Sequence, residues 1–91
     1  MCTYIVETAA VAGSAKGAQG WFAVDRATVS YDHPVHSAVE HALMLDFADE
    51  RRSVEGRRVG VELTLDAARE LARVLAAAIE RAEEYEGVSR V

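Results

Sequence analysis

Hydrophobic and polar residues alternate along much of the first two thirds of the chain, a period of two that is typical of β-strands. Residues 3–11 are rich in β-branched and aromatic types and predict a first strand. Residues 21–31 alternate well enough to predict a second. Between these runs, Gly13, Gly17 and Gly20 predict a flexible connection rather than a regular element.

A third strand is expected from residue 39 to residue 47. The segment Asp32-His33-Pro34 ends the second strand, because proline cannot donate to a β-ladder. Alternation then resumes, with one face carrying His41, Leu43, Leu45 and Phe47. A helix over residues 36–48 is the competing interpretation, because Ala, Leu, Met and Glu favour helices. Residues 49–57 predict a surface hairpin loop and residues 59–63 a short fourth strand.

The period changes from two to 3.6 at Leu65, which predicts a long C-terminal helix. Thr64 is the expected N-cap, and Asp66 complements the positive end of the helix dipole. Gly87 is the expected residue after the C-terminal end. One side of this helix is an apolar stripe made of Ala68, Leu71, Ala72, Leu75, Ala78, Ile79 and Ala82.

These elements predict a single α+β domain over residues 1–91, in which a four-stranded antiparallel meander carries one long C-terminal helix packed on one face. The other sheet face would then expose Tyr, Val, Met and Phe side chains. Because exposed apolar faces usually find a partner, a homodimer or larger homo-oligomer is expected.

Composition and charge narrow the function classes. Hydrophobic residues make up 51% of the chain and the formal net charge is −5, which argues against binding to nucleic acid or to anionic membranes. A single cysteine allows no internal disulfide and suggests the reducing cytoplasm of a bacterial-type cell. The chain shows neither a secretory signal nor an apolar run long enough to cross a bilayer.

Candidate chemistry concentrates in residues 31–47, which contain all three histidines and the only proline. In a meander, the start of the first strand, the turn between strands two and three, and the start of the helix all fall at one end of the sheet. This topology predicts that the histidines and the cysteine converge there. Imidazole suits zinc and other divalent transition metals. The expected metal ligands are His33, His36 and His41, completed or oriented by Cys2, Asp32, Glu40 and Asp46.

The same residues also allow interpretations without a metal site. The spacing of the histidines matches no well-known zinc pattern. In the other interpretation, His33 and His36 are solvated loop residues and His41 lies at the margin of the core. Cys2 would become an amino-terminal nucleophile if Met1 were removed, but the chain has no room for the two-sheet sandwich used by such enzymes. The segment Gly13–Gly17 lacks the order of a phosphate-binding loop.

Three segments carry a resemblance to a known family: Met1-Cys2-Thr3-Tyr4-Ile5-Val6-Glu7, Tyr31-Asp32-His33-Pro34, and Glu40-His41-Ala42-Leu43 followed by Asp46-Phe47. The chain resembles short bacterial proteins of unknown function, some of them encoded near natural-product pathways, over nearly its whole length. The resemblance implies no catalytic assignment.

Two functions are therefore expected from the sequence. The first is a small protein that binds a divalent metal or a small molecule at the histidine end of the sheet, including the case of an accessory enzyme acting on a small molecule. The second is a non-catalytic homo-oligomeric interaction module whose histidines are incidental.

Overall fold

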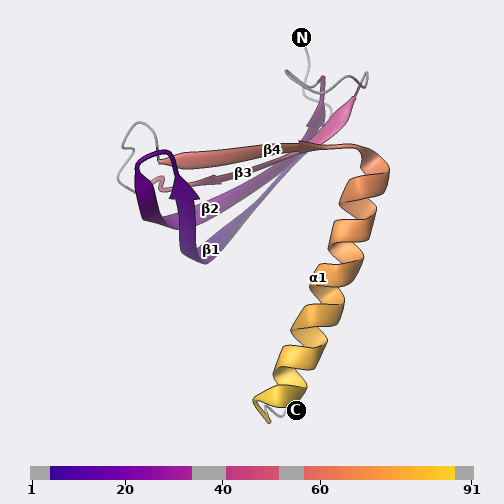
Figure 1. Ribbon diagram of the computed structural model, residues 1–91. Coiled ribbons are helices and arrows are strands. Elements are labelled where there is room, and N and C mark those ends of the chain that lie inside the picture. The colour runs from indigo at the N-terminus through magenta and orange to yellow at the C-terminus, as the bar shows by residue number, and fades with distance from the viewer. Residues whose placement is uncertain (1–4, 34–40, 52–56, 88–91) are drawn as a thin grey trace.

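The computed structural model describes residues 5–33, 41–51 and 57–87. Its elements are β1 (Ile5–Gly17), β2 (Gly20–Asp32), β3 (Ala42–Ala48), β4 (Arg58–Leu63) and α1 (Leu65–Tyr85). The strands form one antiparallel sheet in the order β1-β2-β3-β4, and the helix follows the last strand (Figure 1). The predicted α+β fold with a four-stranded antiparallel meander is confirmed.

The glycine-rich segment is part of a hairpin, so the prediction of a flexible connection was wrong. Strand β1 continues to Gly17, which pairs with Gly20 across a two-residue turn. Gly20 has a φ of 112°, a conformation that glycine adopts without steric cost. The register shifts between Ala10 and Gly13, where β1 carries one residue more than β2. Such a bulge bends the strand and increases its twist.

Strand β3 is a strand and not the helix that its composition also allowed. It lies between β2 and β4 and pairs with both along its length. Two ladders of backbone hydrogen bonds outweigh the weak helix propensity of residues such as Ala42 and Met44, because propensity differences amount to only a few tenths of a kcal/mol per residue.

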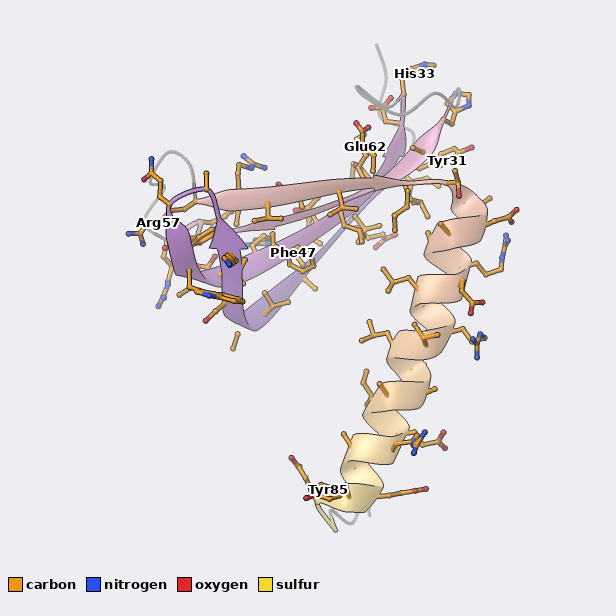
Figure 2. All side chains as sticks on the ribbon, in the orientation of Figure 1. Tyr31, His33, Phe47, Arg57, Glu62 and Tyr85 are labelled. Carbon is orange, nitrogen blue, oxygen red and sulfur yellow. The ribbon has the colours of Figure 1, made fainter. Side chains whose placement is uncertain are left out.

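The registers divide the sheet into two chemically different faces. Three rows across the strands place apolar residues on one side, with Glu7 as the one charged residue in these rows. We call this side the apolar face; it comprises Ile5, Ala9, Ala27, Val29, Tyr31, Leu43, Leu45, Phe47, Val59, Val61 and Leu63. The opposite side, the polar face, includes Thr8, Arg26, Thr28, Ser30, Asp32, Asp46, Arg58 and Glu62. Figure 2 shows Phe47 and Glu62 on opposite sides of the sheet.

Both ends of the helix follow the sequence prediction. Thr64 has extended backbone angles (φ −65°, ψ 161°), and its Oγ1 accepts a hydrogen bond from the Ala67 N–H at 3.1 Å. This bond satisfies one of the donors that the first turn leaves without an intrahelical partner. Asp66 lies in the first turn, and Gly87, with a φ of 70°, follows the last.

The structure differs from the prediction in where the helix lies. Instead of covering a face of its own sheet, α1 projects away from the end of β4 (Figure 1). No residue of α1 is buried, and Leu75 and Ile79 are 57% and 51% exposed. Within the described residues, the buried apolar side chains are few and small: Val24, Ala42 and Ala48.

The end of the sheet far from the helix is held by Asp25. Its Oδ1 accepts the N–H of Glu50 at 2.8 Å, and its Oδ2 accepts the N–H of Arg51 at 3.1 Å. The Arg51 Nε lies 3.2 Å from the same Oδ2. The backbone hydrogen bond from Glu50, aided by the bond and charge of Arg51, lowers the pKa of Asp25 below its ordinary value of 3.8 despite the opposing effect of desolvation.

This lowered pKa predicts a pH dependence of stability. A carboxylate with a lower pKa in the folded than in the unfolded state stabilises the fold above the unfolded pKa, and this contribution is lost as the pH falls through the folded pKa. An Asp25→Asn variant should therefore be less stable than the wild type at pH 7, and the difference should shrink below about pH 4. Urea unfolding across this range measures it, with Glu80→Gln as an exposed control. A difference independent of pH would contradict the assignment.

Candidate functional site

The candidate site lies where β2 ends and β3 begins. Strand pairing sets Tyr31 opposite Leu43 and Asp32 opposite Ala42, and continuing this register by one residue sets His33 opposite His41. Directly opposite side chains in an antiparallel pair lie close enough to touch. The two imidazole rings do so, with centroids 4.8 Å apart and planes tilted by 33°.

Tyr31 adds a third ring. Its centroid lies 5.6 Å from that of His41, and the planes differ by 27° in a stacked arrangement. Tyr31 is the diagonal neighbour of His41, a relation that brings aromatic side chains within reach. Figure 2 shows Tyr31 and His33 at the same end of the sheet. Tyr31 was not among the predicted site residues. Because it lies two residues before His33, however, alternation places both side chains on the same face.

Asp32 supports the site through the backbone. Its side chain alternates to the polar face, the residue is only 3% exposed, and Oδ1 accepts the N–H of His33 at 2.7 Å. Beside it, Ala42 is fully buried at 0% exposure. The hydrogen bond fixes the chain where it leaves β2 and so fixes the position of His33. Asp32 was expected to support the site, and its carboxylate accepts a hydrogen bond from the backbone of His33.

Asp46 does not lie with the histidines. It occupies the polar face in a row with Thr28 and Gly60, whereas alternation places His41 on the apolar side. Its carboxylate forms an ion pair with Arg58, in which Nε donates to Oδ1 at 3.3 Å and NH2 donates to Oδ2. Asp46 follows His41 by five residues. Because this number is odd, alternation along the strand places the two side chains on opposite faces of the sheet.

The described ends of β1, β2 and β4 lie at one end of the sheet, as predicted. Ile5, Tyr31, Leu43 and Leu63 form one row, so the start of β1, the end of β2 and the start of α1 meet near the histidines. Cys2, His36 and Glu40 lie outside the described residues. Within residues 5–33, 41–51 and 57–87, no group of three or more His, Cys, Asp or Glu side chains is arranged to hold a metal ion.

The spacing of the two rings can be compared with that of a metal-bound pair. A zinc–nitrogen bond is about 2.0–2.1 Å, and two imidazoles at tetrahedral angles on one ion place their ring centroids roughly 5 Å apart. The observed separation of 4.8 Å is close to this value. The two imidazole rings of the described residues therefore lie at a centroid separation similar to that of a metal-bound pair.

The fold and this ring cluster define a small α+β protein with a histidine pair at one end of its sheet. The chain belongs to a family of unknown function, DUF6295, whose sequence profile matches residues 1–88. The expected likeness to proteins of unknown function is thus confirmed at the level of the family. No curated protein and no solved structure matches the chain. In the part of the chain that the structure describes, no helix has the length and hydropathy needed to span a membrane.

Proposed function

We propose that this protein binds a divalent transition-metal ion, zinc or one of similar preference, through His33 and His41. The supporting observation is the 4.8 Å separation of the two ring centroids, which the β2–β3 register itself produces. Imidazole nitrogen is a common ligand of such ions.

The neighbours of the pair have distinct roles in this proposal. The stack with Tyr31 limits rotation of the His41 ring, and the Asp32 hydrogen bond holds the backbone of His33. His36 is the sequence-predicted third ligand, and Cys2 and Glu40 are further candidates for completing or orienting the site. Two or three protein ligands leave positions open for water or a small molecule, as in catalytic rather than structural zinc sites. Binding of a small molecule, or an accessory reaction on one, would take place at these positions.

A second function, a non-catalytic homo-oligomeric module, is supported by a different observation. The helix exposes its apolar stripe, and Val61 on the apolar face is 41% exposed. The two proposals are compatible, because the histidine pair lies beyond the last row of the apolar face. The single cysteine in the sequence supports a cytoplasmic setting for either.

Metal titration of the purified chain tests the first proposal. Calorimetry should detect zinc binding to the wild type, and a His33→Gln/His41→Gln double variant should bind at least about 100-fold more weakly, because even loss of an outer-shell partner can cost 10–100-fold. Tyr31→Phe keeps the stacked ring and should change the affinity little. Circular dichroism would confirm that each variant is folded. Equal affinity in the wild type and the double variant would rule out the histidine pair as the site.

A further inference from the structure

The chain exposes more surface than a self-contained domain of its mass. Its accessible surface is 7125 Å², whereas a folded monomer of 9.9 kDa exposes ~5,200 Å². Its radius of gyration is 15.2 Å, against ~12 Å for a compact domain of this length. The excess of roughly 1,900 Å² per chain exceeds the ~800 Å² that each partner buries in a standard interface. It falls in the range of obligate dimers.

Several of the exposed large apolar side chains lie on one side of α1. At 100° per residue, Leu71, Leu75 and Ile79 share a side with Ala78, while Arg69, Arg73 and Ala77 lie on the other. The three large residues are 43%, 57% and 51% exposed. A helix in water gains most of its stability from packing such a stripe against another surface.

The sheet offers a surface of the same character. The apolar face carries one charged residue in its three rows, and both Val61 and Ile5 are more than 40% exposed. Figure 2 shows α1 projecting on the side of the sheet where Phe47 lies. The apolar stripe of α1 and the apolar face of the sheet are therefore two separate surfaces, and the helix does not cover the sheet.

The connection between β4 and α1 is short. Thr64 alone separates Leu63 from Leu65, whereas connections between strands and helices usually contain 2–6 residues. Thr64 is also fixed in an extended conformation by its hydrogen bond to Ala67. So short a connection disfavours folding the helix back over its own sheet, and a second molecule can cover both the stripe and the apolar face.

We infer that the protein forms a homodimer in which the helix stripe of each copy packs on the apolar face of the other. A second copy of the chain fits this role because each chain presents one helix stripe and one apolar face. In a two-fold arrangement, the stripe of each copy covers the apolar face of the other, and no stripe or face remains exposed. The net charge of −5 does not oppose it, since the facing surfaces are almost free of charge. The inference is independent of metal binding at His33 and His41.

Sedimentation of the full chain, with two matched pairs of variants, tests the inference. The wild type at micromolar concentration should have a mass of about 19.8 kDa, twice the 9.9 kDa of one chain. Val61→Lys changes the apolar face, and Val6→Lys makes the same change at an edge-strand valine on the opposite face, where exposure is 54%. Ala78→Glu and Ala77→Glu compare the stripe with the polar side of α1.

Val61→Lys and Ala78→Glu should weaken dimerisation at least tenfold, and Val6→Lys and Ala77→Glu should leave the mass unchanged. Circular dichroism of each variant would show whether it keeps its strands and helix. A wild-type mass of 9.9 kDa, or of three or more chains, would overturn the inference. So would equal effects within either pair of folded variants.

Discussion

Replacing Leu75 and Ile79 together by aspartate should strongly lower the melting temperature and reduce the helix content of the protein. Both side chains are about half exposed in the single chain, at 57% and 51%, so the proposed dimer would bury the remaining half. Full burial of such a side chain contributes about 1.5–3 kcal/mol, and a buried unpaired carboxylate costs several kcal/mol more. The double variant should lose much of a total stability that is typically only about 5–15 kcal/mol.

Circular dichroism at several protein concentrations measures this effect. The melting temperature of the wild type should rise with concentration, because association stabilises the folded chain by mass action, and that of the double variant should not. Ala77→Asp/Glu80→Asp places two aspartates on the polar side of α1 and serves as the control for helix propensity. If both double variants melted at the same temperature, packing of the stripe would not stabilise the protein.

Enlarging Ala42 to leucine should destabilise the fold by about 1–3 kcal/mol, the usual cost of adding methylene groups to a filled site. Ala42 is 0% exposed and pairs with Asp32, so a larger side chain has to displace its neighbours beside the histidines. Ala23→Leu is the matched control, because Ala23 lies exposed on β2. Urea unfolding compares the two variants. Equal stabilities would mean that the surroundings of Ala42 are not tightly packed.

The strand and helix pattern could be predicted because it depends on local alternation and capping. Val59, Val61 and Leu63 alternate with polar residues or glycine, and Thr64 provides the cap where the period changes. The hairpin at Gly17 and Gly20 could not be predicted in the same way. Its pairing depends on the register with β2 and on a bulge after Ala10, and neither leaves a local pattern in the sequence.

The position of the helix could not be predicted from the sequence, for a different reason. Periodicity identifies which side of α1 is apolar, but it does not say whether that side packs on the same chain or on another. The answer depends on the single-residue connection at Thr64 and on the direction in which β4 ends.

The candidate site was predicted in part. Alternation on β2 and β3 and the meander topology were enough to bring His33 and His41 to one end of the sheet. Asp46 was expected to be a supporting residue of the same site, but it lies on the polar face, where it forms an ion pair with Arg58. Alternation along β2 would have included Tyr31, because it places Tyr31 on the same face as His33.

The packing of one chain's helix on another chain's sheet is tested most directly by nuclear Overhauser effects between isotope-labelled and unlabelled copies in a mixed sample. We expect intermolecular signals from the Leu71, Leu75 and Ile79 methyl groups of one copy to Val61 and Phe47 of the other. A mixed sample in which these helix methyl groups show no intermolecular signal to the sheet would contradict this packing.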